Sequence, residues 1–210
     1  MPMILNSADE ALARANELIA KSSKRVVIGI VGKPGAGKST ITSFLLDKLP
    51  KELVALVPMD GYHLSNQQLA RLGLADKKGA FNTFDYAGYI SLLRRINNEP
   101  DQDIYFPIFH REIEESYSAD GVVAAGTKLV LTEGNYLLFD KAGWEQVVPE
   151  LDESWYINID DNLRIDRLVK RHEFYGKDKQ AAIAWANGSD EINAKIVQDT
   201  ANRADVIINL

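Results

Sequence analysis

Short apolar runs rich in β-branched residues alternate with longer amphipathic stretches along this 210-residue chain. Such runs are typical of buried parallel strands, and the amphipathic stretches are typical of the helices that cover them. Strands are expected over residues 26–31, 53–57, 103–108, 128–132, 154–159 and 205–208. Helices are expected over residues 8–20, 39–49, 65–72, 86–97, 161–175, 179–187 and 191–202. The alternation predicts an α/β fold built on a parallel sheet with right-handed crossovers.

Two stretches do not fit the simple alternation. Residues 73–85 are polar and punctuated by glycine, and the region from His172 to Asp199 is helical throughout. We interpret both as excursions from the sheet, the second of them lid-like. Because the chain has no repeat, low-complexity tract or linker, we expect a single domain over residues 1–210.

Composition narrows the classes of function. The formal net charge of −6 argues against nucleic-acid or anionic-membrane partners, so any phosphate-binding charge must be local. The absence of cysteine excludes disulfides and thiol catalysis and fits a reducing compartment. Charged residues interrupt the N-terminal apolar stretches, and no run approaches membrane-span length. We therefore expect a cytoplasmic protein without a membrane or nucleic-acid partner.

A glycine-rich segment follows the first predicted buried strand. It reads Gly32-Lys33-Pro34-Gly35-Ala36-Gly37-Lys38-Ser39 and matches the phosphate-binding (Walker A) pattern G-x-x-x-x-G-K-[ST]. Glycines let backbone N–H groups approach phosphate oxygens, while the lysine reaches the β- and γ-phosphates and the serine hydroxyl binds Mg²⁺. We expect ATP to contact Gly32, Lys33, Pro34, Gly35, Ala36, Gly37, Lys38, Ser39 and Thr40.

This loop alone does not distinguish a kinase from other nucleotide-binding proteins. The chain lacks the Asn-Lys-x-Asp element of GTPases and the Leu-Ser-Gly-Gly-Gln signature of transporter ATPases, which favours a kinase. Asp60 ends the second predicted strand and should reach the crevice beyond the carboxyl ends of the strands. There it either accepts the proton of an attacking hydroxyl or forms an ordinary Asp-Gly turn with Gly61.

Further motifs resemble those of a known family. They are Val57-Pro58-Met59-Asp60-Gly61-Tyr62-His63-Leu64, Lys78-Gly79-Ala80 with Thr83-Phe84-Asp85, Phe106-Pro107-Ile108-Phe109-His110-Arg111, Glu133-Gly134-Asn135-Tyr136-Leu137-Leu138 and Arg167-Leu168-Val169-Lys170-Arg171-His172. Together they resemble the uridine kinase, phosphoribulokinase and pantothenate kinase family, nearest its bacterial nucleoside/nucleotide kinase-like branch. The resemblance implies a three-layer P-loop fold with a five-stranded parallel sheet and a helical lid.

The resemblance also implies roles for individual residues. Catalysis would fall to Asp60 as base, with Lys38 and Arg171. Ser39 and Glu133 would hold Mg²⁺, and Arg167 and Arg171 in the lid would contact ATP. The acceptor would meet Asp60, Tyr62, His63 and Arg111.

Several structural alternatives stay open at this stage. Glu133 could be an ordinary strand-end glutamate. The face of Arg164, Arg167 and Arg171 could be a solvated helix surface that pairs with Asp160, Asp161 and Asp166, the better interpretation for Arg164. Trp144, Trp155 and Trp185 are expected to be core or packing residues.

The expected reaction is transfer of the γ-phosphoryl group of ATP to a hydroxyl of a small metabolite. The acceptor could be a nucleoside, a pantothenate-like compound, a sugar or a sugar phosphate, and the resemblance leaves a homodimer open. The rival is a regulatory protein that binds ATP without kinase turnover. It would need the phosphate loop but no base beside an acceptor pocket.

Overall fold

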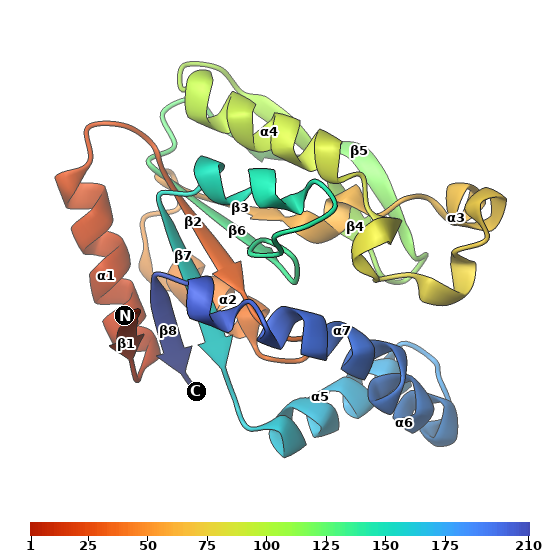
Figure 1. The fold of residues 1–210 in the computed structure, drawn as a ribbon. Helices are drawn as coiled ribbons and strands as arrows, with labels where there is room; N and C mark the ends of the chain where they lie inside the picture. The colour runs from red at the N-terminus through yellow and green to blue at the C-terminus, as the bar shows by residue number, and fades with distance from the viewer.

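A six-stranded parallel sheet forms the centre of the structure, a computed structural model that describes residues 1–210 (Figure 1). Across the sheet the strands are β1 (Met3–Leu5), β8 (Val206–Asn209), β7 (Glu153–Asn158), β2 (Val26–Val31), β6 (Leu129–Gly134) and β3 (Val54–Pro58). The predicted α/β fold with a parallel sheet is confirmed, but the sheet has six strands rather than five. The additional strand is β1, whose three residues are too short to give a periodic signal.

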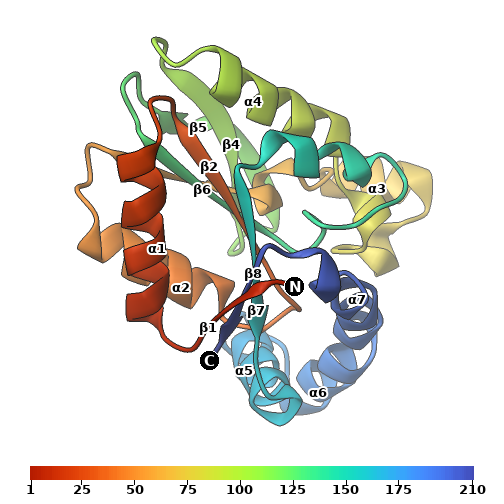
Figure 2. The same cartoon turned by 60° about the vertical axis from the view of Figure 1, so that its left-hand side comes forward.

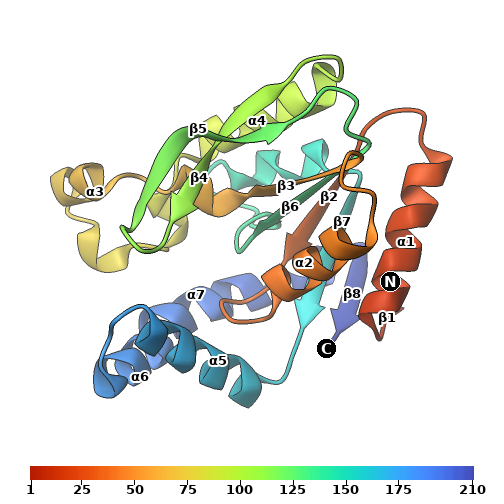
Figure 3. The ribbon, with the colours of Figure 1, turned by 180° about the vertical axis from the view of Figure 1, so that it is seen from behind.

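Side chains of the central strand β2 point alternately to two hydrophobic layers. Val27 and Val31 pack under α4 (Tyr86–Asn98), while Ile28 and Ile30 pack under α1 (Ala8–Lys21) and α2 (Lys38–Lys48). All six residues of β2 are buried, as expected for a strand covered on both faces. Figures 2 and 3 show α1 and α2 on one side of the sheet and α4 on the other.

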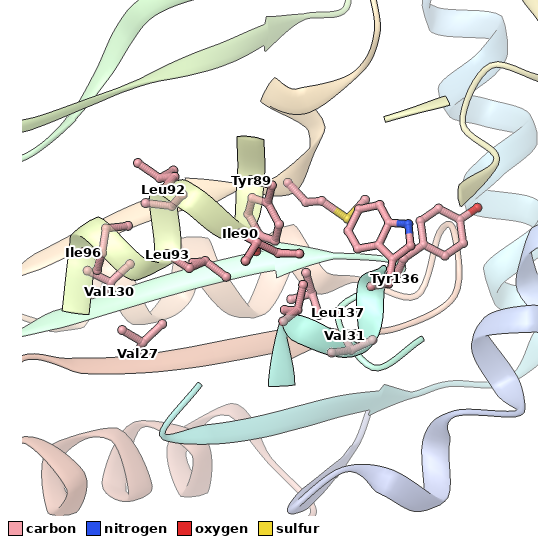
Figure 4. Packing of buried hydrophobic residues seen from close by; sticks show 14 of the residues in the cluster. Val27, Val31, Tyr89, Ile90, Leu92, Leu93, Ile96, Val130, Tyr136 and Leu137 are labelled. Atoms are coloured by element: carbon pink, nitrogen blue, oxygen red, sulfur yellow. The ribbon is translucent and has the colours of Figure 1, made fainter. Parts of the chain in front are cut away.

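The α4 side of the core is the more aromatic of the two. Leu93 and Ile96 of α4 lie over Val27 and Val130 of the sheet, and Tyr136 extends this layer toward the loops beyond the strands (Figure 4). Aromatic side chains therefore support the end of the sheet at which ligands of open α/β folds bind.

One predicted strand lies outside the parallel sheet. Residues 103–108 fall mostly within β4 (Ile104–His110), which pairs antiparallel with β5 (Glu115–Val123) in a separate two-stranded sheet. The parallel sheet expected from the alternation of strands and helices therefore does not include this segment. β5 was not predicted because its sequence, ESYSADGVV, is largely polar and exposed.

Two groups of short elements flank the carboxyl ends of the strands. The first is α3 (Asn66–Leu72) with 3₁₀ turns at Ala75–Lys77 and Phe81–Thr83, which we call the flap (residues 66–85). The second is α5 (Asp161–Phe174), α6 (Lys179–Asn187) and α7 (Ser189–Gln198), which we call the lid helices (Figure 1). None of the helices has the length and apolarity needed to cross a membrane.

Candidate active site

The glycine-rich loop joins β2 to α2 and opens the N-terminus of that helix. Gly35 and Gly37 have φ values of 79° and 95°, which a side chain would strain. Gly37 is the N-cap of α2 and provides no side-chain cap, so the first N–H groups of the helix stay available to an anion. A Cβ on Gly35 would lie 2.8 Å from the carbonyl oxygen of Arg164, so α5 rests directly on this loop.

Lys38 is held in place by three oxygen atoms. Its ammonium donates to the carbonyl oxygens of Gly32 and Lys33 and to Oδ1 of Asn135, at 2.8, 3.3 and 2.7 Å. Burial lowers the pKa of Lys38 to about 8, although Glu133 and Asp60 act in the opposite direction. Asn135 lies in the motif of residues 133–138, but nothing in the sequence indicated a role for it.

Lys33 turns away from the loop that contains it. Its ammonium lies 2.6 Å from Oδ1 of Asp161 at the start of α5, and the residue is only 5% exposed. Neither Lys33 nor Gly32 lines the adjacent cavity, whereas every loop residue from Pro34 to Thr40 does. Lys33 thus joins the loop to the lid, and its side chain is not placed to contact a phosphate.

Glu133, at the end of β6, faces the start of α2. Its two carboxylate oxygens accept hydrogen bonds from the hydroxyls of Ser39 and Thr42, at 2.9 and 3.1 Å. Burial raises the pKa of Glu133, which makes a divalent cation a favourable partner for its charge. Hydroxyl and carboxylate oxygens are the ligands that Mg²⁺ prefers, so these residues fit the metal.

Asp60 lies on a 3₁₀ turn directly after β3, across the cavity from the lid. Arg111 at the end of β4 donates a hydrogen bond to its Oδ2 at 2.5 Å. Gly61 permits this arrangement, because a Cβ there would lie 2.0 Å from the carbonyl oxygen of Pro107. Glycine is thus required for the close approach of the Asp60 turn to β4.

The residues after Asp60 have different surroundings. His63 lines the cavity between the rings of Phe84 and Phe109, with centroid separations of 4.0 and 4.6 Å. Tyr62, expected at the acceptor, lies outside the cavity and packs edge-to-face on Tyr89 at 5.5 Å. Burial raises the pKa of Tyr62 to about 12, as expected for a phenol in the aromatic core.

The three arginines of α5 separate into two kinds. Arg167 and Arg171 line the cavity and form no ion pair. Arg164 is 1% exposed and binds Asp161 at 2.7 Å and Glu191 at 2.5 Å. The expected pairing of Arg164 with Asp161 is confirmed, but the expected solvated surface is wrong, because this side chain is a buried connection between α5 and α7.

One cavity of about 770 Å³ is lined by the phosphate-loop residues 34–40 together with Asp60, His63, Arg111, Glu133, Asn135, Arg167 and Arg171. Its lid-side wall includes Tyr175, Lys177 and Trp185, none of which the sequence singled out as a ligand contact. Trp144 and Trp155 are fully buried, as expected, but Trp185 is only partly buried and faces this space. The arrangement defines the class of protein: an α/β nucleotide-binding fold with a phosphate loop facing a carboxylate.

Comparison with known proteins agrees with this class. Residues 27–210 match the model of the Phosphoribulokinase / Uridine kinase family. A Schizosaccharomyces pombe protein provisionally named a uridine kinase is 31% identical over 97% of this chain and 91% of its own length. A pantothenate kinase from Streptococcus pyogenes is 29% identical over 96% of this chain and 75% of its own length.

A solved structure shows the same agreement in three dimensions. A Silicibacter protein provisionally described as a fructose transport system kinase has a TM-score of 0.82 and 31% identity over 94% of this chain and 97% of that one. The chain belongs to the Phosphoribulokinase / Uridine kinase family.

Proposed function

We propose that this protein transfers the γ-phosphoryl group of ATP to a hydroxyl group of a small metabolite. The observation that carries the proposal is the cavity in which the phosphate loop and the Asp60 carboxylate face the same space. Phosphoryl transfer depends mainly on positioning and on stabilisation of charge, and both sides of this cavity offer such groups.

On the nucleotide side, the N–H groups of the loop and Lys38 would bind the β- and γ-phosphates. Arg167 and Arg171 have no protein carboxylate as ion-pair partner, so their charge is available to phosphate oxygens. Ser39 and Glu133 would hold Mg²⁺, which offsets part of the phosphate charge when bound. Because the protein has a net charge of −6, the positive charge that binds phosphates must come from a local cluster of residues. Lys38, Arg167 and Arg171 form such a cluster at the cavity.

On the acceptor side, Asp60 would take the proton of the attacking hydroxyl. Oδ2 of Asp60 accepts a hydrogen bond from Arg111, whereas Oδ1 has no hydrogen-bond partner in the protein. Oδ1 is therefore open to the acceptor. The new bond joins the acceptor oxygen to the γ-phosphorus, while the bond from this phosphorus to the β–γ bridging oxygen breaks and ADP leaves. The proton passes to Asp60.

The names of the relatives support a small hydroxylated acceptor, since they refer to uridine, pantothenate and fructose. The rival function is ATP binding for regulation, without turnover. A regulator requires the phosphate loop but has no use for Asp60 and Arg111 beside it, so the placement of this pair favours the kinase.

The test is a screen of the purified protein with ATP and Mg²⁺ against nucleosides, pantothenate, sugars and sugar phosphates. We expect acceptor-dependent ADP release, with the phosphorylated product identified by mass spectrometry. Lys38→Ala is the matched control, which should stay folded and release no ADP. Tight ATP binding by the wild type without any phosphorylated product would contradict the kinase and favour the regulator.

A further inference from the structure

A second carboxylate, Asp190, faces the same cavity from the lid. It lies in the first turn of α7, is only 9% exposed and lines the cavity together with its neighbour His172. Nε2 of His172 lies 2.7 Å from Oδ2 of Asp190. Because an ionised carboxylate only accepts hydrogen bonds, this ring nitrogen carries the proton. Oδ1 of Asp190 has no protein partner, which leaves a fixed, charged acceptor atom for a ligand.

The position of Asp190 relates it to the acceptor rather than to the phosphate loop. One turn further along α7, Asn193 donates to the carbonyl oxygen of Gly79 in the flap at 3.4 Å. Tyr136 donates to the same carbonyl oxygen at 2.7 Å. The flap and α7 therefore meet around this part of the cavity.

Arg171 provides a second link between the two carboxylates. Burial and the charge of Arg111 lower the pKa of Arg171, while Asp190 and Asp60 oppose this shift. Both carboxylates therefore lie near the same guanidinium, Asp60 from the turn after β3 and Asp190 from the lid.

The cations that line the cavity beside Asp60 and the flap are already bound within the protein. Arg111 is paired with Asp60. Lys78 donates to Oδ1 of Asn66 and to the carbonyl oxygen of Glu114, at 2.7 and 2.5 Å. The remaining cations are Lys38 of the phosphate loop and three residues of the lid segment 161–177: Arg167, Arg171 and Lys177, the last of which lies over the Trp185 ring at 4.5 Å. The proposed function assigns Lys38, Arg167 and Arg171 to phosphate oxygens, so the free carboxylate oxygens of Asp60 and Asp190 suit the hydroxyl groups of a neutral acceptor.

We propose that Asp190 accepts a hydrogen bond from a second hydroxyl of the acceptor, so that the substrate is a neutral polyhydroxylated compound: a sugar, a polyol or a ribonucleoside. Asp60 would accept the proton of the reacting hydroxyl. Asp190 would select the molecules that bind with this hydroxyl directed toward Asp60. The inference rests on the proposed function for the identity of the acceptor site. It adds to that function a specificity-determining residue and a chemical class.

The test measures binding, so that it does not depend on turnover. D-fructose, D-ribose, xylitol and uridine, with pantothenate and D-glycerate as anionic counterparts, are titrated calorimetrically into protein holding Mg²⁺ and a non-hydrolysable ATP analogue. We expect at least one neutral probe to bind the wild type and to bind Asp190→Asn roughly 10- to 100-fold more weakly, the range for a hydrogen bond to a charged group. Asp199→Asn, an exposed carboxylate just after α7, is the matched control and should leave binding unchanged.

A second measurement guards against loss of structure in the variant. Affinity for the ATP analogue should be unchanged in Asp190→Asn, and deoxy forms of the neutral probe that binds should be compared on both proteins. Removing the hydroxyl that meets Asp190 should weaken binding to the wild type but not further weaken binding to the variant. Binding of anionic probes alone, binding of no probe, or equal affinity in the wild type and variant would overturn the proposal. Binding without any ATP turnover would instead refute the kinase and leave the Asp190 site standing.

Discussion

Nη2 of Arg111 donates a hydrogen bond to Oδ2 of Asp60 over 2.5 Å, joining the end of β4 to the turn after β3. Burial alone would raise the pKa of Asp60, but its interactions with His63, with Arg111 and with more distant cations outweigh burial, so the pKa is lowered. Asp60 is therefore ionised at neutral pH. It can receive a proton through the oxygen that Arg111 leaves free.

The Asp60→Asn variant tests this role directly. The amide keeps the size of the side chain but removes its basicity, so we expect kcat to fall by roughly a hundred- to ten-thousand-fold. A loose transition state depends weakly on a base, which places the expected loss near the lower end of that range. Steady-state kinetics should show little change in KM for ATP, because Asp60 lies on the acceptor side. Normal turnover would exclude Asp60 as the base.

Replacement of Arg111 should change the pH dependence of the reaction. Arg111→Met removes one of the charges that lower the pKa of Asp60, so that pKa rises and the base becomes protonated at a higher pH. The acid limb of the kcat profile should move to higher pH, while Arg111→Lys should move it less. An acid limb at the same pH in the wild type and in Arg111→Met would show that Asp60 does not control it.

The charge of Lys38 should give the pH profile of kcat/KM for ATP a decline on the alkaline side. Burial lowers its pKa to about 8, so the charged form that binds phosphates is lost as the pH rises through this value. We expect kcat/KM for ATP to decline above pH 8, whereas kcat should decline only at higher pH because bound phosphates favour the ammonium. Lys38→Arg stays charged and should lack the limb, although its bulk should slow the reaction. A flat kcat/KM profile to pH 10 in the wild type would contradict this assignment.

Local patterns in the sequence were sufficient for five of the six strands of the parallel sheet and for the phosphate loop. The run of β2 and the glycine spacing are features of contiguous residues, and each depends on nearby backbone geometry. β5 was missed for the opposite reason. Its polar strand is stabilised by pairing with β4, and such pairing leaves no periodic signal in a largely exposed segment.

Side-chain roles within one helix could not be read from spacing. Arg164 and Arg171 both lie on α5, yet only Arg164 meets Glu191, which comes from α7 far along the chain. Trp185 lines the cavity because α6 packs beside α5, and composition alone predicted only packing. Roles that depend on tertiary contacts between distant segments required the structure.

Arg171 offers a test of the lid. Arg171→Lys keeps the positive charge but loses the planar fork that binds two phosphate oxygens at once. We expect kcat to fall about tenfold or more while KM for ATP changes less, since the interaction should strengthen as charge moves during transfer. Lys170→Arg, on an exposed neighbouring position, is the control. An unchanged kcat would mean that Arg171 takes no part in the reaction.

Replacement of Arg164 should lower the stability of the protein, whereas the same replacement of Arg167 should lower its activity. Arg164→Met breaks a buried connection to Asp161 and Glu191 and should lower the free energy of unfolding by about 2 kcal/mol, less than for a fully buried pair because both partners keep solvent contact. Arg167→Met removes a side chain without an ion-pair partner, so it should leave the unfolding free energy unchanged and slow ATP turnover. Urea denaturation measures the first effect and steady-state kinetics the second. If Arg164→Met were as stable as the wild type, the buried connection would not hold the lid helices to the phosphate loop. If Arg167→Met were destabilised instead, Arg167 would belong to the scaffold rather than to the nucleotide site.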